Sequence, residues 1–148
     1  MFVPEELYET IASVMPIPAV EAIIINSKNE ILMLKRNNPP VKGEWWFPGG
    51  RIRRGETFLQ TLTREVKEET GLDVKLLGFV GVYERIFPER HDIPIVFLCR
   101  CRDDQKVILN SEHSDYKFLR GNEALNRSHQ MLKELLADVV EKKLVDFR

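Results

Sequence analysis

Acidic side chains are concentrated in residues 50–72, which contain Glu56, Glu65, Glu68 and Glu69. If this stretch is a helix of about 3.6 residues per turn, Glu65 and Glu69 lie on one side and Glu68 lies one step round. Three carboxylates on about one helical turn repel one another, and a hard divalent cation such as Mg²⁺ relieves that repulsion. The spacing therefore indicates a metal site, with a solvated, charged helix face as the alternative.

The same stretch carries signals for both helix ends. Gly55 and Thr57 resemble a turn that leads into a helix start, and Gly71 stands where a helix stop is expected. With about 100° per residue, Glu69 lies about 20° from Leu62 on the helix surface. A carboxylate directed towards the core is costly unless a cation meets it. The apolar stripe of this helix is expected to comprise Phe58, Leu59, Leu62 and Val66.

The full pattern of this stretch is G-x5-E-x7-R-E-U-x-E-E-x-G-U, where U is a bulky aliphatic residue. It resembles the Nudix box at every fixed position. The resemblance implies a fold of class α+β, a Nudix-type α/β/α sandwich with a mixed central sheet. It also implies hydrolysis of a nucleoside diphosphate linked to another group, with Mg²⁺ or Mn²⁺ as cofactor. The expected metal ligands are Gly49 through its carbonyl, Glu65, Glu68, Glu69 and Glu112.

The composition limits the class of protein. The 148 residues suit a single domain, residues 1–148, with one sizeable core. A formal net charge of −1 gives no electrostatic footprint for nucleic acid or an anionic membrane. No apolar run approaches the roughly 20 residues of a membrane span. Glu5, Glu6 and Glu9 argue against a signal peptide, so a cytoplasmic enzyme is expected. Cys99 and Cys101 should share one face of a strand, in the core.

Apolar periodicity predicts helices and strands along the chain. Helices are expected over residues 4–15 and 127–142, and strands over residues 19–26, 31–36, 74–87, 93–102 and 116–119. The strand at residues 93–102 is apolar on both faces, so it should be central. Together these elements indicate an α+β fold with a mixed sheet between helices. The first helix either packs against the sheet or makes a homodimer contact, and the sequence favours neither.

Two features near the strands expected over residues 19–26 and 31–36 have alternative interpretations. Alternation places Glu21 with Ile23 and Ile25 on an apolar strand face. Glu21 is then either a strand-end residue with its carboxylate in solvent or part of a binding pocket. Trp45 and Trp46 are either core residues or a wall on which a base stacks, and at least one of them is expected in the core.

Three further segments are similar to the GDP-mannose mannosyl hydrolases of the Nudix family. They are residues 16–52 (PIPAVEAIIINSKNEILMLKRNNPPVKGEWWFPGGRI), 81–87 (GVYERIF) and 112–119 (EHSDYKFL). In that subfamily water attacks the anomeric carbon of the sugar, and GDP leaves. The resemblance implies that Arg36 and Arg51 bind the diphosphate and that Glu21 also binds substrate. It implies a catalytic set of Arg51, Glu65 and His113, with His113 as general base on a loop, since its unperturbed pKa of about 6.5 lies near working pH.

The chain also departs from the mannosyl hydrolases. Those enzymes lack the first Glu of the RE pair and one of the EE pair, whereas this chain keeps Glu65, Glu68 and Glu69. It also has Glu21 in place of their Asp and Arg85 in place of their His. A full set of carboxylates favours attack on phosphorus.

Three hypotheses about function follow from the sequence. The first is Mg²⁺-dependent hydrolysis of GDP-mannose or GDP-glucose to GDP and free sugar. The second is attack on phosphorus in nucleoside triphosphates or other nucleoside diphosphate derivatives. The third is a ligand sensor of Nudix fold without activity, which the intact box argues against. In each case the expected partner is a nucleotide or nucleotide sugar, with no nucleic acid and no membrane, and with a homodimer left open.

Overall fold

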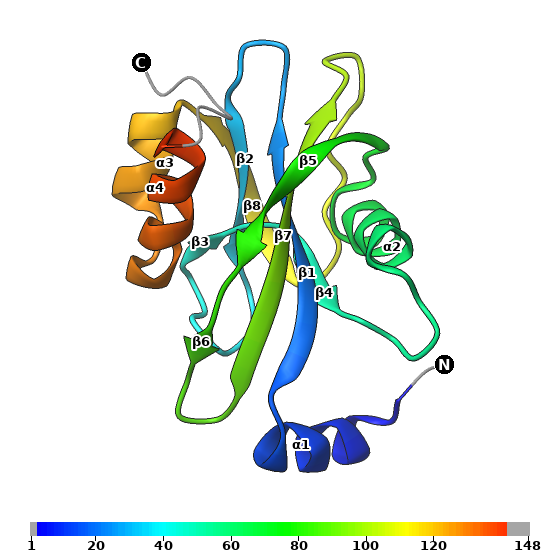
Figure 1. Cartoon of the computed structure of the whole chain (residues 1–148). Helices are drawn as coiled ribbons and strands as arrows, with labels where there is room; N and C mark the ends of the chain where they lie inside the picture. The colour runs from blue at the N-terminus through cyan, green and yellow to red at the C-terminus, as the bar shows by residue number, and fades with distance from the viewer. Residues whose placement is uncertain (1–2, 142–148) are drawn as a thin grey trace.

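Figure 1 shows the fold as a computed structural model that describes residues 3–141, with residues 140 and 141 described by their backbone alone. The helices are α1 (Glu5–Val14), α2 (Phe58–Thr70), α3 (Gly121–Arg127), a 3₁₀ turn (Gln130–Leu132) and α4 (Lys133–Glu141). The strands are β1 (Ile17–Ile25), β2 (Ile31–Arg36), β3 (Trp45–Trp46), β4 (Gly49–Arg51), β5 (Val74–Val82), β6 (Arg85–Ile86), β7 (His91–Cys101) and β8 (His113–Leu119). The α+β class expected from the sequence is confirmed.

The strands form one mixed sheet, in which the main order is β3-β2-β1-β7-β5. Three further strands pair at its sides: β4 with β1, β8 with β2, and β6 with β7. β1 and β7 run parallel, whereas the other paired strands run antiparallel. β7 lies between β1 and β5, as its apolar composition predicted. Cys99 and Cys101 of β7 are buried on the α2 side as free thiols, which confirms their expected place in the core.

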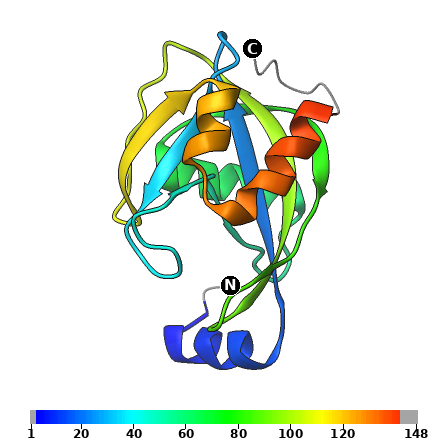
Figure 2. The same ribbon diagram turned by 90° about the vertical axis from the view of Figure 1, so that its left-hand side faces the viewer.

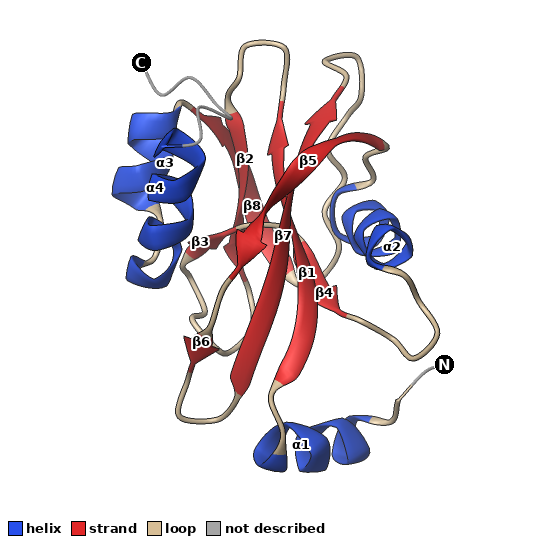
Figure 3. Ribbon diagram, viewed as in Figure 1, coloured by secondary structure: helices blue, strands red, loops and turns tan. Residues whose placement is uncertain are grey.

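Helices cover both faces of this sheet (Figures 1 and 3). α2 lies against one face, and α3 and α4 lie against the other, where they cross the front of the sheet in Figure 2. Alternate side chains of β1 pack in two cores: Ile23 and Ile25 on the α4 side, and Val20, Ala22 and Ile24 on the α2 side. α1 lies apart from both layers at one end of the sheet, and none of its residues is buried.

Both ends of α2 are closed by side-chain and backbone hydrogen bonds. Thr57 accepts a hydrogen bond from the backbone N–H of Gln60 at 3.1 Å, and the Gln60 side chain accepts one from the Thr57 N–H at 2.8 Å. This reciprocal capping box satisfies two free donors of the first turn. Gly71 ends the helix with φ at +72°, in the left-handed region that favours glycine, and its N–H donates to the Lys67 carbonyl. The helix predicted from these signals is confirmed.

The apolar stripe predicted for α2 is half wrong. Leu62 and Val66 are buried in the core, but Phe58 and Leu59 are 49% and 53% exposed. The first turn of α2 lies over the outer strand β5, where Leu76 is also exposed. These side chains line a second, apolar hollow of about 270 Å³, so periodicity identified the face but not how much of it the sheet covers.

The single helix predicted over residues 127–142 is also wrong in its first part. α3 ends at Arg127, Ser128 has an extended backbone with φ −69° and ψ 151°, and α4 begins at Lys133. Nδ1 of His129 accepts a hydrogen bond from the backbone N–H of Met131 at 3.1 Å. Polar side chains that bond to the nearby backbone in this way compete with helix formation. The predicted end of this helix, residue 142, lies outside the described residues.

Two strand predictions need correction. The strand expected over residues 74–87 is divided into β5 and β6, because the Tyr83 N–H donates to the carbonyl of Pro94 on β7 but Pro94 has no N–H to return a ladder hydrogen bond. The strand expected at residues 116–119 begins three residues earlier, since β8 pairs with β2 as far as His113 opposite Arg36. No helix within residues 3–141 is both long enough and apolar enough to cross a bilayer.

Candidate active site

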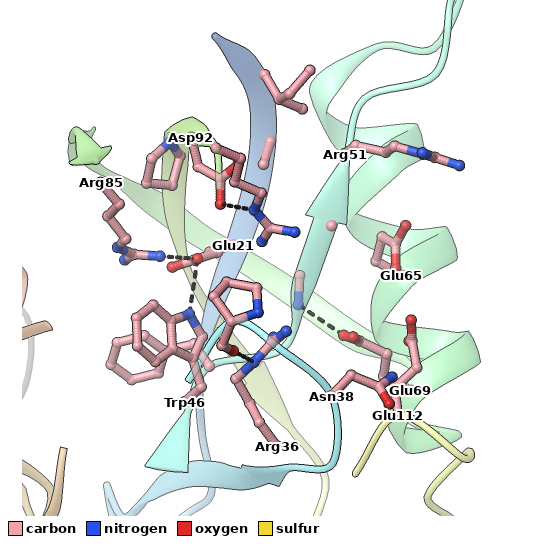
Figure 4. A pocket seen from close by; sticks show the side chains of 18 of the residues that line it. Glu21, Arg36, Asn38, Trp46, Arg51, Glu65, Glu69, Arg85, Asp92 and Glu112 are labelled. Atoms are coloured by element: carbon pink, nitrogen blue, oxygen red, sulfur yellow. Dashed lines mark hydrogen bonds and ion pairs between the residues drawn. The ribbon is translucent and has the colours of Figure 1, made fainter. Parts of the chain in front are cut away.

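A polar cavity of about 330 Å³ opens where β1 and β2 separate. β1 pairs with β2 at Ile25 opposite Ile31, but its other end pairs with β4, so the sheet divides between them. Figure 4 shows side chains from both sides of this gap. The structure brings together along this cavity all the residues that the sequence singled out as candidates: Glu21, Arg36, Gly49, Arg51, Glu65, Glu68, Glu69, Glu112 and His113.

Glu69 is at the centre of the acidic end of the cavity. The residue is 5% exposed, and its Oε2 accepts a hydrogen bond from the backbone N–H of Gly49 at 2.8 Å. Its Oε1 lies 3.1 Å from Nε2 of His113. Burial raises the pKa of Glu69 well above its ordinary value, and the nearby Glu112 carboxylate contributes to this. Glu69 therefore faces the core, as predicted, and burial destabilises the charged form of its carboxylate.

Three side chains at this end are arranged so that they could hold a metal ion. Glu69, Glu112 and His113 each offer a ligand atom, and these atoms lie within 4.8 Å of one another. Carboxylate oxygens beside an imidazole suit a divalent cation, and the positive charge would remove the penalty on Glu69. Of the expected ligands, this group contains Glu69 and Glu112 and adds His113, while Glu65 and Glu68 lie beside a neighbouring arginine.

That arginine is Arg64, which joins α2 to the loop before it. Its guanidinium donates to both carboxylate oxygens of Glu56, at 2.6 and 2.9 Å, and to the Arg51 carbonyl at 3.2 Å. It also donates to Glu65 at 2.5 Å and lies 3.6 Å from Glu68. The contact with Arg64 lowers the pKa of Glu56 to about 2. Arg64 therefore holds the loop against the helix.

The pKa of Glu65 is shifted in the opposite direction to that of Glu56. It is 9% exposed, and burial raises its pKa from 4.5 to about 7, with a further contribution from Glu69. The Arg64 contact opposes this rise without cancelling it. A carboxylate with a pKa near 7 can exchange a proton at neutral pH, which is the property required of a general base.

Two glycines lie close to these carboxylates and to β1. A Cβ added to Gly50 would clash with the Glu65 carboxylate. A Cβ added to Gly49 would clash with the backbone of Val20 and Glu21 on β1. The absence of a side chain therefore lets β4 approach both β1 and α2 closely, as expected for a backbone that comes near a metal site.

The two candidate phosphate-binding arginines lie on different walls of the cavity. Nε of Arg36 donates to the Pro40 carbonyl at 2.9 Å, and burial, with Arg90 nearby, lowers its pKa. The guanidinium of Arg51 lies over the ring of Tyr8 in α1, 3.9 Å from its centroid. Figure 4 shows Arg51 directed away from Glu21, at the far end from the Trp46 group. Both cations therefore lie where an elongated anion could contact them.

The expectation that His113 occupies a loop is wrong. His113 is the first residue of β8 and is buried. Burial lowers the pKa of His113 below its ordinary value of 6.5, and Arg36 lowers it further. Its Nε2 is engaged by Glu69. That contact holds the ring in one position rather than leaving it free to close over a sugar.

A buried ion pair that the sequence did not reveal forms the other end of the cavity. Glu21 of β1 pairs with Arg85 of β6, and Oε2 of Glu21 also accepts a hydrogen bond from the Trp46 indole N–H at 3.3 Å. The Arg85 guanidinium lies 4.9 Å from the Trp46 ring centroid (Figure 4). The available signal was Glu21 itself, since a carboxylate on an apolar face requires a cation. Trp46 is buried, which confirms the prediction that at least one tryptophan is in the core.

Comparison with known proteins identifies the family. Residues 15–139 match the family model described as NUDIX domain. The chain belongs to the Nudix family. An ADP-ribose pyrophosphatase of Methanocaldococcus jannaschii is 45% identical to this Nudix chain over 87 residues, which cover 56% of this chain and 50% of that protein. The chain therefore spans half the length of that relative.

Two other similar proteins are matched over a larger share of their length. Low-salt glycan biosynthesis protein Agl8 of Haloferax volcanii is 28% identical over 123 residues, which cover 78% of each protein. The solved structure of a MutT protein from Methanosarcina mazei Go1 superposes with a TM-score of 0.80 and 27% identity, covering 88% of this chain and 97% of that one. These similar proteins carry different names, so the substrate must be argued from the site.

Proposed function

We propose that this Nudix protein hydrolyses the diphosphate linkage of a nucleoside diphosphate derivative by attack of water on phosphorus, with Mg²⁺ or Mn²⁺ as cofactor. The observation that supports this is the convergence of Glu65, Glu69 and Glu112 on one cavity wall. The pKa values of Glu65 and Glu69 are both raised by burial, which is the condition that a bound cation relieves.

The metal would be held at the acidic end of the cavity. Glu69 and Glu112 are the first candidates, because their carboxylate oxygens suit a hard cation and lie together beside His113. Glu65, Glu68 and the Gly49 carbonyl, which the sequence suggested, line the same cavity. A bound Mg²⁺ would supply positive charge that stabilises the negative charge developing on the diphosphate oxygens.

The chain's own residues have separate roles in this proposal. Glu65, which lines the cavity beside Glu69, accepts the proton of the attacking water. The water oxygen forms a bond to one phosphorus, and the bond between that phosphorus and the bridging oxygen breaks. The bridging oxygen leaves with the second phosphate. Arg36 and Arg51 bind the phosphate oxygens, for which the planar guanidinium is suited.

A second candidate is hydrolysis of GDP-mannose or GDP-glucose to GDP and free sugar. His113 favours it, because the resemblance to mannosyl hydrolases implies a base at this position and His113 lines the cavity. In that reaction His113 accepts the proton of water, the water oxygen bonds to the anomeric carbon, and the bond from that carbon to the diphosphate breaks. The engagement of His113 by Glu69 makes this the weaker candidate.

Product analysis by ³¹P NMR on a panel of nucleotide sugars and nucleoside triphosphates separates these reactions. GMP with sugar phosphate supports attack on phosphorus, whereas GDP with free sugar supports attack on carbon. With water labelled by ¹⁸O, label in the phosphate and a larger rate loss in Glu65→Gln than in His113→Gln support the first proposal. Label in the free sugar with a large His113→Gln effect supports the second. Binding without turnover of any compound in Mg²⁺ would support a ligand sensor.

Three other expectations from the sequence stay predictions. They are a single domain over residues 1–148, a cytoplasmic location and a homodimer. None of them enters the reaction as proposed, because all the residues assigned to it line one cavity of one chain.

A further inference from the structure

The Glu21–Arg85 pair has polar atoms left without a partner. Glu21 is 7% exposed and Arg85 is 3% exposed. Within the described part of the chain, Oε1 of Glu21 and both Nε and Nη2 of Arg85 are buried and make no hydrogen bond. Buried polar atoms are almost always hydrogen-bonded, because leaving them unsatisfied costs free energy. Three such atoms, in a pair that lines the cavity, are suited to bind a polar ligand.

The remaining atoms of the pair fix it in place. Oε2 of Glu21 accepts from both Nη1 of Arg85 and the Trp46 indole N–H. The Trp46 ring also lies against the guanidinium. Both charged residues line the cavity, so the pair is held rigidly from one side and has an unused acceptor and two unused donors. A rigid set of this kind is suited to recognition.

We propose that this end of the cavity binds the nucleobase of the substrate, and that it prefers a base with a lactam edge, in which a carbonyl lies beside an N–H. Guanine, hypoxanthine and uracil have such an edge. The inference rests on the proposed function, in that it assumes a nucleotide substrate. It assigns to Arg85 and Glu21 a specificity role, separate from the metal and phosphate roles of the acidic end.

The preference for a lactam edge follows from the numbers of hydrogen-bond donors and acceptors. A carbonyl oxygen has two lone pairs and can accept from both free N–H groups of Arg85. The adjacent lactam N–H can donate to the free oxygen of Glu21. Adenine and cytosine instead place a ring nitrogen with one lone pair beside an amino group, so one donor of Arg85 would stay unpaired. A site with buried polar groups discriminates strongly against a ligand that leaves them unpaired.

The surroundings of the pair fit a planar base. Trp46, Phe47 and Phe87 line the cavity next to it, and aromatic walls suit a flat heterocycle whose polar edge meets the pair. Glu21 lies opposite Gly49 in the β1–β4 ladder, and Gly49 contacts Glu69. The base site and the metal site are therefore neighbours along one cavity, of a size usual for small-molecule sites.

The first test compares substrates that differ in one part only. kcat/KM in Mg²⁺ is measured for GTP, ITP, UTP, ATP and CTP, and for GDP-mannose against GDP-glucose. Equilibrium binding of the same compounds is measured by calorimetry in Ca²⁺. We expect the lactam nucleotides to be favoured by about 10- to 100-fold in both measurements, since one bidentate base contact discriminates by about that much. Dependence on the sugar with no dependence on the base would overturn the assignment in favour of sugar hydroxyls.

The same panel separates this inference from the proposed function. Hydrolysis of every nucleotide at similar rates and with similar affinities would refute base recognition and leave the diphosphate chemistry standing. Selective binding of lactam nucleotides without hydrolysis of any compound would refute the diphosphate chemistry and leave the base site standing.

The second test alters the pair itself. Glu21→Gln alone would leave Arg85 buried without its counter-charge, so the variant to use is the double substitution Glu21→Gln with Arg85→Gln, which replaces the ion pair by neutral amides. We expect it to fold and to lose the lactam preference to within about threefold. Glu84→Gln, at an exposed position outside the cavity, is the matched control and should keep the preference. A folded double variant with the wild-type preference would overturn the assignment, and the substrate panel on the wild-type chain stands whether or not the variant folds.

Discussion

Replacement of Glu65 by Gln should stabilise the metal-free protein while it removes turnover. Glu65 is 9% exposed, next to Glu69 and the Arg64 guanidinium. Gln has nearly the same shape and keeps an oxygen that can accept the hydrogen bond from Arg64. The substitution removes only the charge that burial opposes, so its effect on stability reports the cost of that charge in the folded chain.

The magnitude follows from the raised pKa of Glu65. The folded chain binds this proton more tightly than the unfolded chain, because the pKa is about 7 instead of 4.5. Folding is therefore progressively destabilised as the pH rises from 4.5 through about 7, and the loss is complete above that range. At about 1.36 kcal/mol per pH unit, the full loss is about 3 kcal/mol. The free energy of unfolding of Glu65→Gln should therefore exceed that of the wild-type chain by about 3 kcal/mol at pH 8, and by little at pH 4.5.

Urea denaturation in excess chelator, followed by tryptophan fluorescence, measures this difference. Mg²⁺ should stabilise the wild-type chain at pH 8 and should stabilise Glu65→Gln less. Glu68→Gln, which removes a half-exposed carboxylate from the same helix, should change the free energy of unfolding by less than about 0.5 kcal/mol. The reasoning is refuted if Glu65→Gln is no more stable than wild type at pH 8 without metal, or if its advantage is the same at pH 5.

Three further substitutions test the remaining parts of the site. Glu69→Gln should keep the fold and lower kcat by about 100-fold or more, and wild-type turnover in that variant or in excess chelator would contradict the metal assignment. Arg51→Lys should lower kcat/KM by about tenfold, because it keeps the charge but loses the bidentate fork, and an unchanged rate would mean that a point charge is sufficient. Gly50→Ala should impair both stability and turnover because its Cβ meets the Glu65 carboxylate, whereas Gly78→Ala, whose Cβ would have no neighbour within 4 Å, should keep full turnover.

Local patterns in the sequence were sufficient to predict the ends of α2 and the burial of Glu69. The helical period placed Glu69 beside Leu62, and both are buried. Thr57 and Gly71 marked the helix ends correctly because their signals depend on nearby backbone groups. The exposure of Phe58 was not predictable in the same way, since it depends on how far the sheet extends beneath the helix rather than on the helix itself.

Contacts between distant segments explain the other differences. Glu21 was expected on an apolar strand face, but its partner Arg85 lies 64 residues away and belongs to a strand of two residues. His113 was expected in a loop because the resemblance to the mannosyl hydrolases implied one. It belongs to β8 because the register with β2 continues past a bulge to Arg36. Pairing of this kind depends on the assembled sheet, so it cannot be predicted from the sequence of one segment.

The position of α1 has a consequence for how selectivity can change. The region shared with the family begins at residue 15, directly after α1, and α1 has no buried residue, yet Glu5 and Tyr8 line the cavity. Local opening of an element that buries little apolar surface costs less free energy than global unfolding, so the amides of α1 should exchange with deuterium faster than those of β1. Substitutions in α1 would then alter access to the cavity without disturbing either core. Evolution can therefore vary what enters this site independently of whether the chain folds.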